Sequence, residues 1–390
     1  MSDRPLSVAI VRARYNPFGG AERFVQRALA ALGGHAELTV IARHWPGAEA
    51  GSGAAPLPVR FERVDPFHVG SVWRDWSFAR GVRRLVARRH FDLVQSHERI
   101  AGLPVYRAGD GVHRVFLRQR LRALPWWRRA MVLANPHHAW VLHAERAMFR
   151  HPALRAVICN SVMVRDEIAA HFGVAPSRLH VVRNGIDLQR FRPAQPAERA
   201  AARAALGLAD GEAAALFVGS GFERKGLAAC LHALARLDAS SRLRLFVVGA
   251  DRRAGAWRRL ARRLGVGARV SWLGPRHDVL PSLHAADLFV LPTLYDPFPN
   301  AALEALACGL PVVTSTASGA AEFIEAGRNG YVVDALDHAA LARAMTAIEA
   351  ADGQLRSAMQ REAHASVQSL SLEHLGRELV ALYRRLLAAR

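Results

Sequence analysis

A chain of 390 residues with 51% hydrophobic and 22% charged residues is too long for one ordinary core and too apolar to be disordered, so it predicts two globular domains. Its formal net charge of +20 lies mainly in the first half, because residues 1–195 hold 30 Arg and no Lys against 14 acidic residues. Such a surplus favours a phosphate-bearing partner, whether nucleic acid, an anionic membrane or a phosphorylated substrate, and charge alone does not choose among them.

Short β-branched runs alternate with helical patterns in both halves, which is typical of parallel sheets covered by helices on both faces. In the first half we predict a helix over 21–32 and strands over 6–11, 38–41, 92–95, 156–159 and 179–182. In the second half we predict strands over 213–218, 243–248, 269–273, 287–291 and 311–314.

This α/β pattern predicts two doubly wound, Rossmann-like domains, residues 1–190 and 191–370. A C-terminal helix, residues 371–390, is expected to pack back on the first domain. The seam is placed in the stretch 187–196, which carries Pro193 and Pro196 and precedes an Ala-rich helix. Ligands of open parallel sheets bind beyond the carboxyl ends of the strands, so the chemistry is expected in a cleft between the two domains.

A glycine loop follows the first strand of each predicted domain. Gly19 and Gly20 end a strand and open a helix, where backbone amides can approach an anion, although a tight turn would look the same. The second loop, residues 219–226, reads GSGFERKG and is neither a dinucleotide fingerprint nor a P-loop. Lys225 is the only lysine of the chain, and with the planar fork of Arg224 it favours phosphate binding over a solvated charged turn.

Two carboxylates stand out in the block 291–311. Asp296 ends a strand-to-helix loop, and Glu304 lies about two turns inside an otherwise apolar helix. A buried carboxylate is costly without partners, and the paired hydroxyls of a ribose would supply them. Without the two glycine loops, a surface Glu and a loop Asp would explain the same residues.

Adjacent tryptophans flanked by arginines mark the stretch 116–150. Such a pattern suits the headgroup layer of an anionic bilayer, where indole rings lie at the interface and cations meet phosphate. The alternative is a basic helix pair whose tryptophans pack on the domain. The residues expected to contact the membrane are Arg118, Arg122, Trp126, Trp127, Arg128 and Arg129.

The remaining signals concern compartment and metals. No stretch approaches the roughly 18 unbroken apolar residues of a spanning helix, and the start lacks a secretory apolar region, so we expect a cytoplasmic protein. Cys159, Cys230 and Cys308 stand singly in apolar sequence and are expected to be core thiols. No Asp-x-Asp pair is present, so we expect neither a metal nor another cofactor.

Five segments, in this order and spacing, resemble the retaining glycosyltransferases of family 4, which have the two-domain GT-B architecture. They are the Gly19–Gly20 loop and residues 182–191, 221–226, 274–279 and 296–311. The resemblance implies that Arg224 and Lys225 hold the donor diphosphate and that Glu304 holds the ribose. It implies that Asp296, where the family usually has Glu, contacts the transferred sugar. The donor site so implied is Gly19, Gly20, Gly221, Arg224, Lys225, Arg276, Asp296, Asn300, Ala301 and Glu304.

Within this family the segment 105–114 is most similar to bacterial lipopolysaccharide core glycosyltransferases. The resemblance implies that Asp110 lies near the acceptor and acts in catalysis with Arg224 and Lys225. The alternative is an aspartate that caps the helix expected to start near His113.

We therefore expect a monomeric, metal-independent enzyme, peripheral on the inner face of the inner membrane. It would transfer a hexose, with retention, from a nucleotide sugar, UDP-linked, to the lipid-linked oligosaccharide of the lipopolysaccharide core. One alternative is a soluble or polyprenyl-linked acceptor in capsule or exopolysaccharide synthesis. Another is a basic nucleic-acid-binding protein, which would need a recognition helix or aromatic-plus-basic motifs on a sheet face, and neither is evident.

Overall fold

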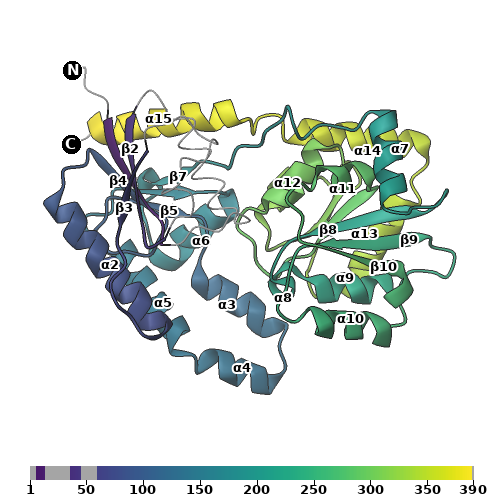
Figure 1. Ribbon diagram of the computed structural model, residues 1–390, viewed down its shortest axis with the longest axis horizontal. Coiled ribbons are helices and arrows are strands. Elements are labelled where there is room, and N and C mark those ends of the chain that lie inside the picture. Colours follow the sequence, from purple (N-terminus) through teal and green to yellow (C-terminus); the bar gives the residue numbers. More distant parts are fainter. Residues whose placement is uncertain (1–5, 14–35, 45–58, 389–390) are drawn as a thin grey trace. The chain divides into compact units, whose positions relative to one another are not determined.

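The computed structural model describes residues 6–13, 36–44 and 59–388, which divide into two compact units (Figure 1). Unit 1 comprises the described residues up to Gly185 and those from Leu372 onward, and unit 2 comprises Ile186–Ser371. The first crossing between units therefore falls just before the boundary predicted after residue 190. Gly19, Gly20 and the helix predicted over 21–32 lie outside the described residues.

Unit 1 contains a parallel sheet with the strand order β3-β2-β1-β4-β5-β6-β7. The strands are β1 (Leu6–Val11), β2 (Ala36–Ala42), β3 (Val59–Arg63), β4 (Leu93–Ser96), β5 (Val105–Ala108), β6 (Ala156–Cys159) and β7 (Leu179–Val181). The five strands predicted in this half are confirmed. Strands β3 and β5 were not predicted, because β3 is a charged edge strand and β5 is four residues long with an arginine inside it.

The helices of unit 1 cover both faces of this sheet (Figure 1). They are α2 (Gly70–Arg88), α3 (His113–Arg122), α4 (Trp126–Leu133), α5 (Pro136–Phe149), α6 (Val162–Phe172) and α15 (Leu372–Ala388), with a short 3-10 turn, η1 (Pro176–Arg178). The alternation of β1 explains the two layers: Val8 and Ile10 pack with α15 on one face, and Ala9 and Val11 pack with α2 on the other.

Helix α15 is the last element of the chain and belongs to unit 1. Its apolar stripe, Leu375, Leu379, Leu382 and Tyr383, is buried against β1 and its neighbouring strands. The Tyr383 hydroxyl donates a hydrogen bond of 2.7 Å to Oε1 of Gln95 in β4. Helix α15 therefore closes the sheet face opposite to the one that α2 covers.

Unit 2 contains a second parallel sheet, in the order β10-β9-β8-β11-β12-β13. Its strands are β8 (Ala213–Val218), β9 (Leu243–Val248), β10 (Val270–Gly274), β11 (Leu288–Leu291), β12 (Val312–Ser315) and β13 (Gly330–Val333). Its helices are α7 (Pro196–Ala205), α8 (Phe222–Lys225), α9 (Leu227–Leu234), α10 (Ala254–Arg263), α11 (Leu280–Ala285), α12 (Asn300–Ala307), α13 (His338–Glu349) and α14 (Gly353–Ser366), with 3-10 turns η2 (Gly267–Arg269) and η3 (Gly319–Phe323).

The predicted fold class, two doubly wound parallel sheets, is confirmed by these two units. All five strands predicted in the second half are present, and β13 is an additional edge strand. Strands β8 and β11 are neighbours although β9 and β10 separate them in sequence. The loops that leave their carboxyl ends therefore meet, which positions the candidate site.

Candidate functional site

The loop after β8 is shaped by two glycines in the left-handed region. Gly221 (φ 73°) and Gly226 (φ 81°) bound α8, a single turn that presents Arg224 and Lys225. The backbone N–H of Phe222 donates to Oδ2 of Asp251 at 2.7 Å, which fixes the start of this turn to the loop after β9. At Gly226 the chain passes so close to Pro292 that a Cβ atom would overlap the Pro292 carbonyl oxygen.

Backbone hydrogen bonds join this turn to the loop after β11. The carbonyl oxygen of Arg224 accepts from the N–H of Leu294 at 2.8 Å and from the hydroxyl of Thr293 at 2.9 Å. The guanidinium of Arg224 donates to the carbonyl oxygen of Tyr295 at 3.3 Å. The two loops are thus one connected piece of structure, with the basic pair of the first against the aspartate of the second.

Lys225 and Asp296 form an ion pair in which both side chains are largely buried, whereas Arg224 is 43% exposed and lies 3.9 Å from Oδ2 of Asp296. Burial opposes the charge on Asp296, but Lys225 and Arg224 outweigh it and the pKa of this carboxyl is lowered. Burial also lowers the pKa of Lys225, against the attraction of Asp296. Arg224 is therefore an exposed cation next to Lys225, whose charge is paired with Asp296.

The backbone of Asp296 is held on both sides. Its N–H donates to the carbonyl oxygen of Ala317 at 3.0 Å, and its own carbonyl oxygen accepts from the N–H of Gly319 at 2.9 Å. An isolated parallel bridge with Ser318 completes this contact. The backbone from which the carboxylate extends is therefore held in place, as it would not be in a flexible loop.

Helix α12 carries the other predicted donor residues of this loop. Glu304 is 1% exposed and is surrounded in sequence by buried apolar residues, so it is not the surface glutamate of the alternative interpretation. Asn300 and Ala301 form the first turn of α12 and are partly exposed. Arg276 lies on the exposed loop after β10.

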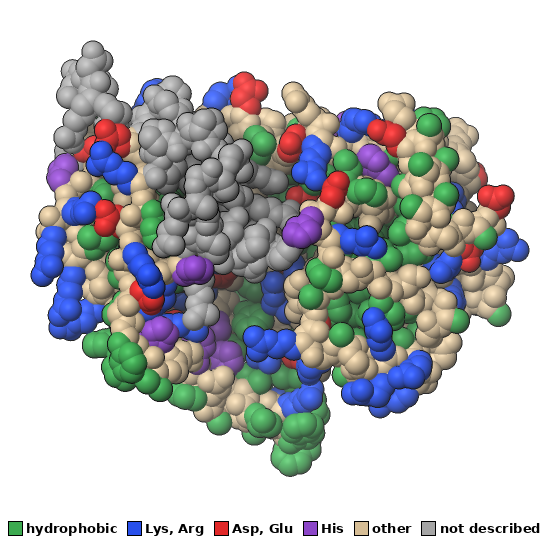
Figure 2. All heavy atoms as spheres, viewed as in Figure 1, with side chains coloured by type: hydrophobic (Ala, Val, Ile, Leu, Met, Phe, Trp, Pro, Cys, Tyr) green, Lys and Arg blue, Asp and Glu red, His purple; other side chains and the backbone are tan. Residues whose placement is uncertain are grey.

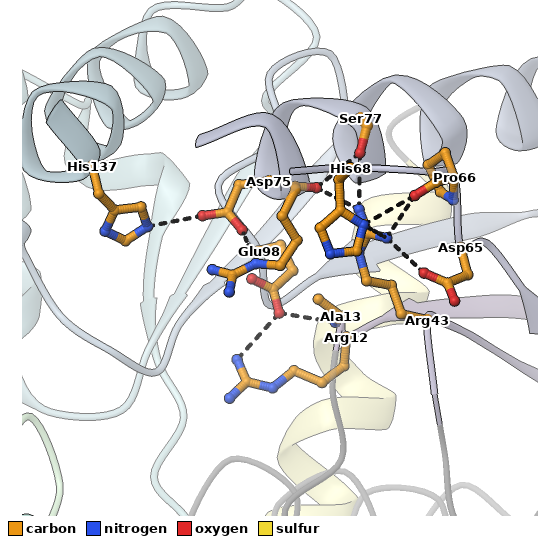
Figure 3. Close-up of polar contacts among 11 residues, drawn as sticks. Arg12, Ala13, Arg43, Asp65, Pro66, His68, Asp75, Ser77, Glu98 and His137 are labelled. Atoms are coloured by element: carbon orange, nitrogen blue, oxygen red, sulfur yellow. Dashed lines mark hydrogen bonds and ion pairs between the residues drawn. The ribbon is translucent and has the colours of Figure 1, made fainter. Parts of the chain in front are cut away.

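In unit 1, Asp110 lies on the exposed turn after β5, with its Oδ2 atom 3.9 Å from a guanidinium nitrogen of Arg12 and of Arg99. Next to it, Oε1 of Glu98 accepts from Arg12 at 3.5 Å and from the N–H of Ala13 at 2.9 Å (Figure 3). These residues follow β1, β4 and β5, three adjacent strands. The carboxyl edge of this sheet therefore gathers charged side chains of both signs.

Helix α3 begins at His113, and its N-cap residue is Val112 rather than Asp110. Helix α3 has no side-chain cap from its own N-cap residue, Val112. Instead, the N–H of His113 donates to Glu145 of α5, at 2.9 and 3.2 Å to the two carboxylate oxygens. Glu145 also accepts from Nε of Arg99 at 2.9 Å and is buried, so a residue far away in sequence does the capping.

Four charged residues of this region were not predicted from the sequence: Arg12, Glu98, Arg99 and Glu145. The first three immediately follow β1 and β4, and charged residues directly after a buried strand are a usable signal for a site at the carboxyl edge. Glu145 gave no such signal, because a single glutamate in an amphipathic helix is usually solvated. Histidines link the same region: His137 contacts Asp75 of α2 at 3.0 Å, as Figure 3 shows, and His113 contacts His138 at 3.0 Å.

Helix α4 presents its tryptophans outward. Trp126 is 80% exposed and Trp127 48% exposed, so they do not pack on the domain as the alternative interpretation required. Val132, with Leu117 and Leu124, forms the small core that holds α4 to α3. Arg118, Arg122, Arg128 and Arg129 are all exposed, with the Arg128 guanidinium over the Trp127 ring.

A second exposed apolar group lies at the start of α2 and before it. Together with the group on α4 it forms what we call the aromatic patch, and Figure 2 shows hydrophobic side chains at the edge of unit 1 over both helices. The residues of the aromatic patch are Phe67, Val69, Trp73, Trp76, Trp126, Trp127, Met131 and Leu133. Single exposed apolar residues are ordinary, but several large ones gathered on two helices indicate an interaction surface.

Within 6–13, 36–44 and 59–388, no three His, Cys, Asp or Glu side chains gather as a metal site would require. Over the same part of the chain, no helix has both the length and the apolar character needed to cross a bilayer.

Comparisons with known proteins agree with this fold. The family model for Glycosyltransferase Family 4 matches residues 18–190, and that for Glycosyl transferases group 1 matches residues 212–350. The chain is 32% identical over 326 residues to the D-inositol 3-phosphate glycosyltransferase of Rhodococcus jostii (strain RHA1), covering 79% of this chain and 70% of the relative.

Two solved structures are similar over nearly the whole chain. WaaG, a glycosyltransferase involved in lipopolysaccharide biosynthesis, has a TM-score of 0.81 at 25% identity, covering 96% of this chain and 99% of WaaG. Anabaena HepE, solved in complex with UDP and glucose, has a TM-score of 0.74 at 20% identity, covering 97% of this chain and 100% of HepE. At 20% identity, the likeness between this chain and HepE concerns the fold alone.

Gly226→Ala tests the close approach of the two loops in unit 2. A left-handed φ costs an alanine about 1–2 kcal/mol, and at Gly226 the overlap with Pro292 adds to that cost. The matched control is Gly207→Ala, which has a similar φ of 64° but open space around the added Cβ. Urea unfolding should show a larger loss of stability for Gly226→Ala than for Gly207→Ala, and equal losses would contradict the contact.

Proposed function

The chain is a family 4 glycosyltransferase with the GT-B fold, and we propose that it moves a hexose from a UDP-linked sugar to a lipid-linked acceptor, the lipopolysaccharide core oligosaccharide. The observation that carries the donor half of this proposal is the buried Lys225 and Asp296 pair with Arg224 exposed beside it. A nucleotide sugar has a diphosphate, a ribose and a hexose, and the unit 2 residues offer one partner for each.

The diphosphate would lie against Arg224 and Lys225. Arg224 is already exposed and offers a planar fork to phosphate oxygens. Lys225 offers a point charge, which would contact both the Asp296 carboxylate and a phosphate oxygen. The Asp296 carboxylate, held by its backbone, would be left to accept from a hydroxyl of the hexose. Complexes of HepE with UDP and glucose support a donor of this kind for the fold.

The reaction that we propose breaks the bond from the hexose C1 to the diphosphate oxygen and forms a bond from an acceptor oxygen to C1 on the same face. The proton of the acceptor hydroxyl goes to the departing phosphate. Negative charge develops on that phosphate, and preorganised cations stabilise it without having to reorganise. We propose that Arg224 and Lys225 meet this charge, so that no metal ion is required. On the acceptor side we propose that Asp110 receives a hydroxyl of the acceptor.

A donor-hydrolysis screen tests the donor site. Purified full chain is incubated with UDP, GDP and ADP sugars, and the released nucleotide is measured. We expect UDP release, and we expect Lys225→Ala to lower turnover about a hundredfold, because one lost transition-state charge contact is worth about 3 kcal/mol. Lys225→Arg should also be impaired, since the planar fork does not fit a point-charge site.

The control for this screen is Arg343→Ala, which removes an exposed cation of α13 in the same unit. Full turnover in Lys225→Ala would remove this residue from the mechanism. Each reaction is repeated with EDTA. Turnover that EDTA abolishes and Mg²⁺ or Mn²⁺ restores would contradict the metal-independent part of the proposal.

Glu304→Gln tests the proposed contact to the ribose. The amide keeps the volume of the side chain but accepts hydrogen bonds without a charge, so UDP should bind more weakly by about 1–2 kcal/mol, or roughly tenfold. Calorimetry with UDP measures this change, and the melting temperature reports the fold. An unchanged dissociation constant with a lowered melting temperature would make Glu304 a structural residue of α12.

The aromatic patch supports the lipid-linked acceptor. A lipid anchor stays in the bilayer, so an enzyme acting on the attached sugar has to work at its surface. The patch exposes indole rings next to Arg128 and Arg129, and unit 1 carries most of the positive charge. Rings at the headgroup layer and cations at lipid phosphate are the usual means of peripheral attachment. We propose that unit 1 binds the inner face of the inner membrane through this patch.

A second acceptor class has its own support. The 32% identical relatives are D-inositol 3-phosphate glycosyltransferases, so a small phosphorylated acceptor fits the sequence no worse than a lipid-linked one. The two proposals differ in one physical property, because only the lipid-linked acceptor requires attachment to a membrane.

Vesicle sedimentation separates these acceptors. We expect binding to vesicles that contain anionic lipid and none to neutral vesicles, since each basic residue near such a surface contributes about 1 kcal/mol. High salt should weaken binding but leave a remainder that comes from inserted rings. Trp126→Ala with Trp127→Ala should remove that remainder.

The control for the vesicle experiment is Leu355→Ala, which trims an exposed apolar residue of α14 in unit 2. Sedimentation that is equal with neutral and anionic vesicles, or that the tryptophan double variant leaves unchanged, would count against membrane attachment. Such a result would favour the small acceptor.

A further inference from the structure

Unit 1 contains a basic pocket of about 340 Å³ between α3, α5 and α6 that the donor and acceptor residues do not explain. Its basic lining residues are Arg114 of α3, His143, Arg146 and Arg150 at α5, and His171 of α6. We propose that this pocket binds a phosphate monoester or diphosphate carried on a group of about sugar size. The proposal concerns unit 1 alone and does not depend on the donor site.

The three arginines are available to a ligand. Arg146 and Arg150 are four residues apart on one helix, so their side chains extend over the same face, and Arg114 faces them from α3. Within the part of the chain that the structure describes, none of these three guanidinium groups has an ion pair or a side-chain hydrogen bond. Guanidinium forks match phosphate oxygens in geometry as well as in charge.

The acid in the pocket wall does not neutralise these arginines. Glu145 lines the pocket, but its carboxylate accepts from Nε of Arg99 at 2.9 Å and from the N–H of His113 at the start of α3. Because both oxygens of this carboxylate already accept hydrogen bonds from these partners, Glu145 is committed to the fold. The charge left facing the pocket is positive.

The pKa of His171 depends in part on this positive charge. Burial lowers the pKa of His171, and repulsion by Arg118 and Arg114 lowers it further, while Glu145 acts in the opposite direction. A phosphate dianion in the pocket would screen the arginines and raise this pKa. The histidine is therefore a built-in reporter of an anion.

The pocket also has an apolar side. Leu142 and Phe172 line it, and the Phe172 ring is fixed by contact with Phe149 at 4.4 Å between ring centres. Its volume falls within the range of small-ligand sites. Its wall adjoins the acceptor residue, because Glu145 accepts from Arg99, which lies 3.9 Å from Asp110.

The test uses the Lys225→Ala chain in every arm, which weakens the proposed donor site equally in all of them, so that failure of either proposal can be told apart. Sodium pyrophosphate is titrated by calorimetry. Arg146→Gln with Arg150→Gln should raise its dissociation constant at least about tenfold, because two guanidinium groups that donate charged hydrogen bonds to phosphate are lost. Arg83→Gln with Arg84→Gln on α2 removes the same charge from exposed positions outside the pocket and should change it little.

Nuclear magnetic resonance of the His171 ring gives a second readout. Pyrophosphate should raise the pKa of His171 in the Lys225→Ala chain and in the α2 control, but not in the Arg146 and Arg150 variant. The proposal would be overturned if the pocket variant and the α2 control had the same dissociation constant for pyrophosphate. It would also be overturned if pyrophosphate did not raise the pKa of His171.

A lipid arm separates the two sources of such a phosphate. Vesicles containing phosphatidic acid, whose headgroup is a phosphate monoester, are compared with vesicles containing phosphatidylglycerol. If the ligand is a headgroup, the pocket variant should lose a preference for phosphatidic acid that the α2 control keeps. If the ligand is a free phosphate ester, the pocket variant should lose pyrophosphate binding while both vesicle types bind as before. Either result supports a phosphate pocket and identifies its source.

Discussion

The ion pair between Lys225 and Asp296 is the contact on which the organisation of unit 2 around its candidate site depends. It joins residues 71 positions apart through loops that leave two adjacent strands, and both side chains are largely buried. Each of these two buried charges compensates the other, and Arg224, 3.9 Å from Asp296, adds a second positive charge beside the carboxylate. The backbone bonds from Arg224 to Leu294 and from Asp296 to Ala317 and Gly319 hold the two charges in register, so a ligand meets a preorganised site.

The single lysine of the chain has a steric explanation at this position. Its side chain passes over Gly219, and a Cβ atom there would lie 3.1 to 3.4 Å from three successive carbons of the lysine stem. A thin aliphatic stem with a compact head fits this passage, whereas a guanidinium is wider and planar. An otherwise all-arginine chain thus keeps one lysine where the passage between a glycine and a buried carboxylate is narrow.

The sequence was most informative where periodicity decides structure and least where distant segments meet. Buried strands such as Leu243–Val248 are predicted by their apolar, β-branched runs, and the resemblance assigned Arg224, Lys225 and Asp296 to one donor site, although it did not predict the ion pair between them. Edge strand β3 alternates charged residues and resembles a loop. The capping of α3 by Glu145, and the exposure of Trp126, depend on how α3, α4 and α5 pack, which no local pattern encodes. Which residues line the basic pocket depends on the same packing.

The chain passes from unit 1 to unit 2 after Gly185 and returns after Ser371, so unit 2 is an insertion in unit 1. The two crossing segments lie side by side: Ile186 forms an isolated bridge with Ser371, and its N–H donates to the carbonyl oxygen of Leu370 at 2.6 Å. During synthesis the strands of unit 1 are made before unit 2, but α15, which packs with Val8 and Ile10 on one face of the sheet, is made after unit 2. Unit 2 holds all of its own strands and can fold earlier. Unit 1 therefore becomes complete only after unit 2 has been translated, and until then the apolar residues that pack with α15 are open to aggregation.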